Sequence, residues 1–285
     1  MSLRFLLIFS AIAFFVDQAS TEPLRVLTFN LRYATAPDGE NAWPLRKETA
    51  LGVIADFAPH LLGVQEALRE QVDIVAERFP HLAPLGVGRE ADGGGEYSAL
   101  LYDRGRLDVL SADTFWLSDM PEVRGSNTWG AGCPRVCTWA RFVDRATNDV
   151  LTVANTHWDH QSQPARLKGA ELMAQRLGAI TEPLIVMGDF NAGPTNPARL
   201  ALAKLGIRDS FADLFPAEAN AGTFHAFQPQ AASDKIDAIL VSSVWRVTAA
   251  EIVRGQPGQR YASDHYPVTA AVELASADKE RGDDK

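Results

Sequence analysis

The chain is poor in cysteine and in basic residues, and both shortages limit what it can be. Of its 285 residues only Cys133 and Cys137 are cysteine, so at most one intramolecular disulfide can form. Lysine and arginine total 27 against 36 acidic residues, which gives a net charge of −9. Because nonspecific nucleic-acid binding depends on basic side chains at phosphates, this balance argues against it but leaves room for a local basic groove.

The sequence also lacks an internal repeat, a Pro/Ser-rich linker and, after the N-terminus, any apolar segment of membrane length. We therefore predict that residues 21–275 form one domain around a large core, with no stable membrane insertion of the mature chain. Residues 276–285 are polar and charged, and we expect them to form a disordered tail.

The N-terminus has the order of a secretory signal peptide. Arg4 is followed by the apolar segment Phe5 to Val16 and then by a short polar stretch. This segment is short for a membrane span, so we predict that residues 1–20 direct export and that the protein is secreted or periplasmic. Asp17 is unfavourable for cleavage after Ala19, and an uncleaved N-terminal anchor is the alternative.

The two cysteines lie in the segment Cys133-Pro134-Arg135-Val136-Cys137. A short-loop disulfide can form in an oxidising compartment, but Cys137 opens a predicted strand whose side-chain direction disfavours it, so a disulfide and two thiols both remain open. No histidine or further cysteine flanks the pair, and a metal site here is not expected.

Five short polar clusters, each beside an apolar segment, carry most of the functional information. They are Thr28-Phe29-Asn30, Gln65-Glu66, Asn155-Thr156-His157, Gly188-Asp189-Phe190-Asn191 and Ser263-Asp264-His265. Any one of them is more often a turn or a helix cap. Five at the ends of predicted buried strands predict one shared pocket.

The apolar periodicity alternates between strands and helices. Helical spacing appears over 44–57, 68–79 and 165–180, whereas 97–154 contains only strand-like segments. Consecutive strands favour antiparallel pairing. We therefore predict an α/β fold, a four-layer sandwich of two mainly antiparallel β-sheets flanked by helices.

Carboxylate, amide and imidazole groups dominate the predicted pocket. Hard oxygen ligands of this kind suit Mg²⁺ or Mn²⁺ and leave room for a substrate phosphate. The remaining histidine and aspartate side chains suit general acid–base chemistry. The pattern predicts a divalent-metal site with acid–base groups beside a bound phosphate.

The order Asn, Gln-Glu, His, Gly-Asp-Phe-Asn, Ile-Asp and Ser-Asp-His resembles the endonuclease/exonuclease/phosphatase superfamily, which includes deoxyribonuclease-like nucleases, sphingomyelinases and inositol-polyphosphate phosphatases. The resemblance extends from Leu24 to Leu274 and implies the same sandwich fold. Four shorter matches point to a bacterial branch of metal-dependent hydrolases: Asn30 to Tyr33, Phe115 to Ser118, Cys137 to Ala140 and His157 to His160.

The resemblance implies a division of roles among the polar clusters. Glu66, Asn30 and Asp264 would hold the divalent ion, expected to be Mg²⁺ with Mn²⁺ as the alternative. Asp189 would orient or deprotonate the attacking water, and Asn191 would hydrogen-bond the phosphate.

Two histidine–carboxylate pairs are implied in the same way. His265 resembles the second catalytic histidine, and Asp237 resembles the acid that fixes its tautomer. His157 resembles the first histidine, with Glu96 in the place of its carboxylate partner.

Substrate contacts are predicted on one further segment and one loop. Arg135 lies where deoxyribonuclease-like members of the superfamily place a phosphate-contacting arginine, and its planar guanidinium fits phosphate oxygens. A surface salt bridge is the ordinary alternative for such an arginine. Trp158, Asp159 and His160 follow His157 directly, and we expect them to contact substrate rather than only to pack the loop. Aromatic residues within 114–129 could form a lip for a ring next to the phosphate or be buried.

Three functions are compatible with the sequence. We favour an exported Mg²⁺-dependent phosphoesterase, a metal-dependent phosphoric ester hydrolase that acts as a monomer on a small or lipid-linked phosphate ester or diester. A secreted nuclease is the alternative, and the acidic composition disfavours it. A binding module with a dead site is least favoured, because no expected catalytic position has been replaced.

Overall fold

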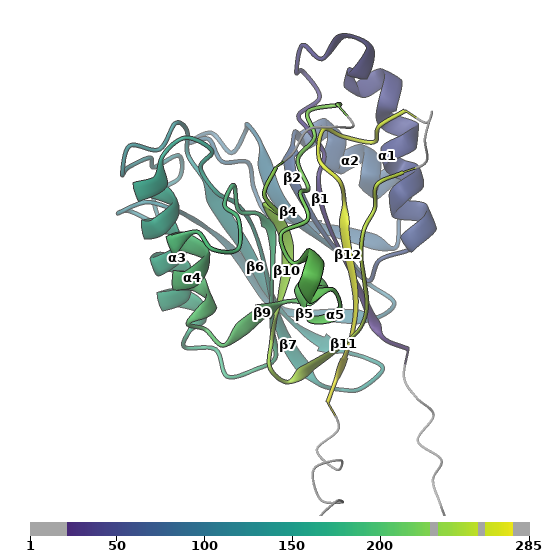
Figure 1. The fold of residues 1–285 in the computed structure, drawn as a ribbon, viewed down its shortest axis with the longest axis vertical. Coiled ribbons are helices and arrows are strands. Elements are labelled where there is room, and N and C mark those ends of the chain that lie inside the picture. The colour runs from purple at the N-terminus through teal and green to yellow at the C-terminus, as the bar shows by residue number, and fades with distance from the viewer. Residues whose placement is uncertain (1–21, 229–232, 256–259, 276–285) are drawn as a thin grey trace, which may run out of the picture.

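The computed structural model describes residues 22–228, 233–255 and 260–275, which form a layered α/β sandwich (Figure 1). The expected signal peptide and the expected C-terminal tail lie outside the described residues. No helix in the described part of the chain is both long and apolar enough to cross a membrane.

The first sheet has six strands in the order β11-β12-β1-β2-β4-β3. Their bounds are β1 Leu24–Asn30, β2 Leu61–Ala67, β3 Leu82–Leu85, β4 Tyr97–Asp103, β11 Trp245–Ile252 and β12 Val268–Leu274. Only β1 and β2 pair in parallel, with Asn30 opposite Gln65. The crossover between these two strands is helix α1 (Trp43–Phe57), as parallel pairing requires.

The second sheet has the order β5-β6-β7-β8-β10-β9. Its strands are β5 Leu107–Trp116, β6 Val136–Asp144, β7 Val150–His157, β8 Leu184–Asp189, β9 Ile207–Asp209 and β10 Asp237–Ser242. Here β7 and β8 are the parallel pair, and α3 (Gln163–Leu177) connects them. Each sheet is therefore antiparallel except at one pair, as predicted.

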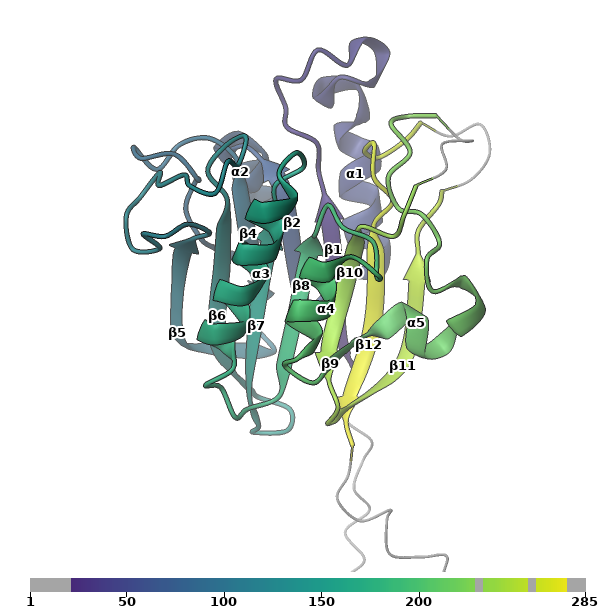
Figure 2. The same cartoon turned by 60° about the vertical axis from the view of Figure 1, so that its left-hand side comes forward.

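The helices cover the outer faces of the two sheets (Figures 1 and 2). Helices α1 and α2 (Arg69–Arg78) pack on the first sheet through an apolar cluster that includes Ile54 and Val75. Helices α3 and α4 (Pro197–Ala203) cover the second sheet. The remaining helical segments are α5 (Ser210–Leu214) and two single turns, η1 (Gly39–Asn41) and η2 (Pro216–Glu218).

The main core lies between the two sheets. Leu61 and Val26 of the first sheet pack in one cluster with Phe142, Val153 and Ile239 of the second. Because both faces of each sheet are covered, the central strands are almost continuously buried, which explains their uninterrupted apolar sequences. The three predicted helices are confirmed, with ends that differ by at most three residues.

Candidate active site

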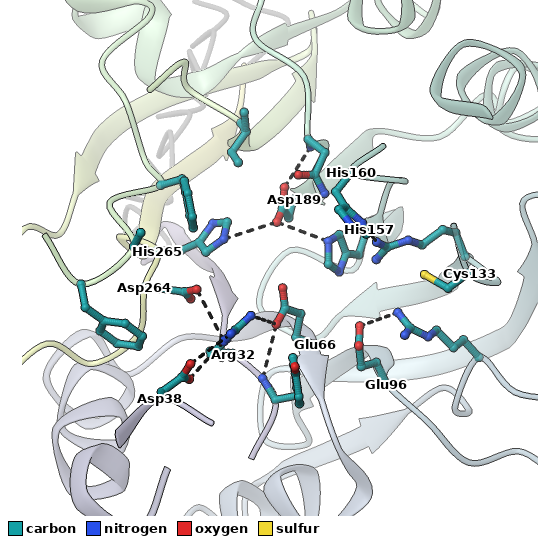
Figure 3. A pocket seen from close by; sticks show the side chains of 18 residues that line it. Arg32, Asp38, Glu66, Glu96, Cys133, His157, His160, Asp189, Asp264 and His265 are labelled. Carbon is teal, nitrogen blue, oxygen red and sulfur yellow. Dashed lines mark hydrogen bonds and ion pairs between the residues drawn. The ribbon is translucent and has the colours of Figure 1, made fainter. Parts of the chain in front are cut away.

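One cleft of about 690 Å³ opens at the end of the sandwich where β1, β2, β7 and β8 terminate (Figure 3). The two parallel pairs bring Asn30 beside Gln65 and His157 beside Asp189. The antiparallel partner β10 begins opposite Asp189, at Asp237. The ionisable residues that line the cleft are Arg32, Tyr33, Asp38, Glu66, Arg89, Glu96, Cys133, Arg135, His157, His160, Asp189, Asp264 and His265.

A buried polar bridge fixes the two sheets to each other beneath this cleft. The side-chain amide of Gln65 donates to Oδ1 of Asn155 at 2.7 Å, and the amide of Asn155 donates to the carbonyl oxygens of Val64 and Ala99. Both amides are fully buried, so each contact replaces hydration that was lost on folding. Gln65 and Asn155 are thus structural members of their clusters.

The neighbouring Glu66 reaches the cleft because β2 is irregular at this point. The pairing with β4 shifts register between Val64 and Ala67, and Glu66 has a φ of 57°, in the left-handed region. Such a bulge inserts an extra residue and redirects its side chain. Strain of this kind in a non-glycine residue is concentrated at functional sites.

Asp189 depends on the glycine before it. Gly188 has a φ of 146°, and a Cβ at this position would lie 2.0 Å from the carbonyl oxygen of Thr156 on β7. Only glycine allows the two strands to approach this closely, which accounts for the first residue of the Gly-Asp-Phe-Asn cluster. Phe190 is buried against Trp158, with ring centroids 4.9 Å apart.

Asp189 lies between two histidines at the centre of the cleft (Figure 3). Its Oδ2 is 3.5 Å from Nε2 of His157 and 3.8 Å from Nε2 of His265, and it accepts a 3.0 Å hydrogen bond from the amide of Asn30. Its Oδ1 accepts from the backbone N–H of Asn191. Burial, together with the charge of Asp237, raises the pKa of Asp189 to about 7.

The two histidines are driven toward opposite charge states. Burial and the nearby Arg135 guanidinium lower the pKa of His157 well below its usual value. Burial alone would also lower the pKa of His265, but Asp237 and Asp189 outweigh it and hold this pKa well above the usual value. The cleft therefore presents a neutral imidazole and an imidazolium on either side of one carboxyl group.

Arg32 is the main site residue that the sequence analysis missed. Its guanidinium donates to both oxygens of Asp38, at 3.1 and 3.0 Å, and lies 3.8 Å from Glu66 and 3.7 Å from Asp264 (Figure 3). Its carbonyl oxygen is held by Arg46 and Gln71. Its position two residues after Asn30, beside a predicted metal ligand, is the one sequence signal that could have identified it as a site residue.

The predicted metal ligands fit a hard divalent ion in part. Glu66 and Asp264 line the cleft with carboxylate oxygens at its mouth, the donor type that Mg²⁺ and Mn²⁺ prefer. Asn30 differs from the prediction: its oxygen accepts from the backbone N–H of Arg32, and its nitrogen donates to Glu66 and Asp189. In this arrangement Asn30 positions the two carboxylates.

A second group of side chains could also hold a metal ion by distance. One ligand atom from each of Asp189, Asp237 and His265 lies within 4.8 Å of the others. Nδ1 of His265 is already 2.9 Å from Asp237, and Asp189 already accepts hydrogen bonds from Asn30 and from the backbone N–H of Asn191, so these groups are engaged with one another and with the protein. We therefore favour the Glu66 and Asp264 side of the cleft.

Glu96 does not pair with His157, contrary to the prediction. Its Oε2 accepts from Nη1 of Arg89 at 2.5 Å, and no hydrogen bond or ion pair within 4 Å joins the two described side chains of Glu96 and His157. Both still line the cleft. The carboxylate beside His157 is that of Asp189, which sequence reasoning had assigned only to the attacking water.

The predicted substrate contacts separate into two groups. Arg135 and His160 line the cleft, and Nη2 of Arg135 is 3.0 Å from Nδ1 of His160. Nε and Nη1 of Arg135 are buried without a hydrogen-bond partner among the described residues, and Nε lies 3.8 Å from the carboxylate of Asp159. An arginine with unsatisfied donors in a cleft is suited to bind an anion.

Trp158 and Asp159 are not at the cleft surface, so their predicted substrate contact is wrong. Trp158 is fully buried, and its indole N–H donates to the sulfur of Met173. Asp159 accepts from the backbone N–H groups of Gly132, Gln161 and Ser162 and thereby shapes the loop. Both residues follow the end of β7, where a side chain can pack in the core or stabilise a turn instead of contacting substrate.

The aromatic residues at the cleft also differ from those considered in the sequence. Phe115 and Trp116 are buried core residues, and both cysteines are free thiols. Instead, Tyr33, Phe224 and Phe227 line the cleft on the side of Glu66 and His265. They are scattered in sequence and carry no periodic signal, so only the fold could bring them together.

Comparisons with known proteins agree with this geometry. The family model described as "Endonuclease/Exonuclease/phosphatase family" matches residues 27–265. A structure of the endonuclease/exonuclease/phosphatase from Bacteroides vulgatus is 32% identical with a TM-score of 0.80, over 88% of this chain and 99% of that one. No curated protein matches the sequence.

Two structures from Bacteroides thetaiotaomicron are also similar. A protein of the same family is 28% identical with a TM-score of 0.82, over 90% of this chain and 99% of that one. A mannosyl-6-phosphatase is 29% identical with a TM-score of 0.80, over 88% of this chain and 100% of that one. The similarity therefore spans the whole of these relatives.

Proposed function

Because the chain belongs to the endonuclease/exonuclease/phosphatase family, we propose that it is an exported, Mg²⁺-dependent phosphoesterase that hydrolyses a small or lipid-linked phosphate ester or diester. Mn²⁺ is the alternative ion. The observation that carries the proposal is the position of Asp189 between two histidines of opposite charge state, in a cleft that also presents Glu66, Asp264 and Arg135. Export rests on the expected signal peptide.

The metal would be held by Glu66 and Asp264, where it would polarise a phosphate oxygen and stabilise charge on the leaving oxygen. Arg32 lies within 4 Å of both carboxylates and partly neutralises their charge. Asn30 orients the other oxygen of Glu66 through a 3.1 Å hydrogen bond.

Asp189 would accept a proton from the attacking water. A pKa near 7 suits a general base at neutral pH, because half of the carboxyl groups are ionised and their basicity is well above that of an ordinary aspartate. Asn191 lines the cleft beside Asp189, and one of its two amide protons is used on the carbonyl oxygen of Trp158. The second is left for a phosphate oxygen.

His265 would stabilise the negative charge that develops on the phosphoryl oxygens. Its Nδ1 faces Asp237, so its Nε2–H is directed toward Asp189 and the cleft. Neutral His157 would hydrogen-bond the phosphate from the other side, and the positively charged Arg135, which also lines the cleft, would attract a second oxygen.

The size and chemistry of the cleft favour a compact substrate. Its volume of about 690 Å³ is that of a small-molecule site, and acidic and aromatic residues share its wall with the basic ones. The mannosyl-6-phosphatase relative supports a phosphatase over a nuclease. A duplex would instead require a continuous basic surface.

A hydrolysis screen tests the proposal. Purified protein would be assayed with Mg²⁺ or Mn²⁺ on phosphomonoesters, phosphodiesters, phospholipids, DNA and RNA, with Asp189→Asn as the inactive control. We expect turnover of a small ester or diester that depends on the metal. Efficient, strongly salt-sensitive cleavage of double-stranded DNA with little action on small esters would show a secreted nuclease instead.

A further inference from the structure

Three aromatic side chains, Tyr33, Phe224 and Phe227, line the cleft, and we call this set the aromatic wall. All three are half-buried, so each ring keeps a face or an edge available to a ligand. The Phe224 ring lies 4.9 Å from the ring of His265, which puts the wall directly beside the proposed reacting centre. None of these residues has a place in the chemistry described above.

The backbone holds this wall in a strained conformation. Ala226 and Phe227 have φ values of 49° and 59°, two consecutive non-glycine residues in the left-handed region. Each such residue costs about 1 kcal/mol or more, and the cost persists only where surrounding contacts enforce it. Here the backbone N–H groups of His225 and Ala226 both donate to the carbonyl oxygen of Asp264, at 2.9 and 3.1 Å.

His225 anchors the strained segment from below. Its ring is buried and stacks on Tyr266 with centroids 4.1 Å apart, and Tyr261 packs at 4.5 Å. Neither ring nitrogen has a hydrogen-bond partner among the described residues, so His225 serves as a flat packing element. These contacts tie the segment that carries Phe227 to the one that carries Asp264 and His265.

We propose that the aromatic wall binds the alcohol part of the substrate and selects phosphate esters of a ring-shaped alcohol, such as a pyranose. Phosphate oxygens would be recognised by Arg135 on the other side of the cleft, so the wall is left for the organic group. Aromatic rings provide a large apolar contact area with little loss of side-chain entropy, and their faces pack well against the C–H groups of a ring. An acyclic alcohol would cover much less of this surface.

The wall also argues against a second phosphate at this position. Its two phenylalanines carry no charge, and the guanidinium of Arg32 is engaged by Asp38 and stacks over the Tyr33 ring at 4.8 Å. The guanidinium of Arg46 lies 5.9 Å from the Phe227 ring, but it is fully buried and donates to backbone carbonyl oxygens. A polyanion that continued along the cleft would lose hydration here without gaining a cation. The inference rests on the proposed phosphoesterase function and adds the class of alcohol.

Binding of non-hydrolysable analogues tests the wall separately from catalysis. Isothermal titration calorimetry would compare the phosphonate analogues of a hexose 6-phosphate and of glycerol 3-phosphate, in wild type, Phe227→Ala and Phe227→Tyr. We expect wild type to bind the hexose analogue about tenfold more tightly, a difference of ~1.4 kcal/mol. Phe227→Ala should remove this preference, Phe227→Tyr should keep it, and affinity for the glycerol analogue should change less than about twofold.

Phe215→Ala is the matched control, because Phe215 is an exposed phenylalanine outside the cleft. Equal affinity of wild type for the two analogues, or an equal loss for both in Phe227→Ala, would overturn the proposal even if the enzyme hydrolyses phosphate esters. A preserved hexose preference with no hydrolysis of any ester would instead refute the proposed function and leave the wall assignment standing. The KM values of an active enzyme should change in the same direction, with kcat nearly constant.

Discussion

Nδ1 of His265 lies 2.9 Å from Oδ2 of Asp237, although the two residues are 28 positions apart and are positioned by strands of different sheets. Asp237 begins β10 of the second sheet, whereas His265 lies three residues before β12 of the first. This contact joins the two halves of the sandwich at the cleft. It also fixes which nitrogen of His265 faces the substrate.

Asp237→Asn should therefore reduce turnover by about 10²-fold with little change in fold, because the imidazolium loses its charge partner and its preferred tautomer. Removal of the carboxylate lowers the pKa of His265, so less of the cationic form remains at neutral pH. NMR titration of His265 in both proteins measures this shift. An unchanged pKa together with unchanged kcat would contradict the assigned roles.

Glu66→Gln should abolish most activity and weaken Mn²⁺ binding measured by calorimetry, because the neutral amide keeps the shape but loses the charge that attracts a divalent ion. Glu77→Gln is the matched control on the exposed surface of α2. Chelation of wild type should have the same effect as the mutation. Full turnover in excess EDTA would rule out the metal requirement.

Arg32 and Asp38 should affect metal affinity in opposite directions. Arg32→Met removes a positive charge that lies within 4 Å of both Glu66 and Asp264, so Mn²⁺ affinity should rise, on the order of tenfold. Asp38→Asn removes the carboxylate that balances this guanidinium, and affinity should fall. If both substitutions changed affinity in the same direction, they would be acting through altered loop structure.

Arg135→Ala should lower turnover of a small phosphodiester by about 10²-fold, the loss of one charge-assisted contact of ~3 kcal/mol. Arg104→Ala, an exposed arginine at the opposite end of the sandwich, is the control. Polyanion binding by wild type should be weak and nearly independent of salt, because few counterions are released. A steep salt dependence would indicate a basic groove and favour the nuclease.

The fold could be predicted because its signals are local and repeated. The period of the apolar residues alone identifies the apolar strands of five to eight residues and the helices α1 and α3. The layered arrangement follows because both faces of each sheet must be buried. The order of polar clusters at strand ends then predicted Glu66, Asp189 and His265 in one cleft. The roles of these residues stay predictions.

The errors in the site have a common physical cause. Trp158 and Asp159 follow His157 directly, but sequence proximity does not determine whether a side chain points to the cleft, to the core or to its own turn. Glu96 pairs with Arg89, seven residues away, a local contact that outcompetes a distant imidazole. Arg32 and the aromatic wall depend on left-handed backbone conformations, which no periodic pattern reports.

His60 should make the folded state sensitive to mild acid. It is buried at the start of β2, next to Leu61, and its Nδ1 accepts a 3.1 Å hydrogen bond from the backbone N–H of Arg25. Burial, assisted by the charges of Arg25 and Arg106, lowers its pKa from 6.5 to about 4. Between these two values the unfolded chain binds a proton that the folded protein does not.

The free energy of unfolding contributed by neutral His60 is therefore fully present above pH 6.5 and is lost as the pH falls toward 4. Between pH 7 and pH 5, the loss in the free energy of urea unfolding should be about 1–2 kcal/mol smaller in His60→Asn, which keeps an acceptor for Arg25, than in wild type. The lowered pKa values of His157 and His225 add the same loss to both proteins. His81→Asn, at an exposed histidine, should retain the wild-type pH dependence. If His60→Asn lost as much stability as wild type over this range, another group would be responsible for the acid sensitivity.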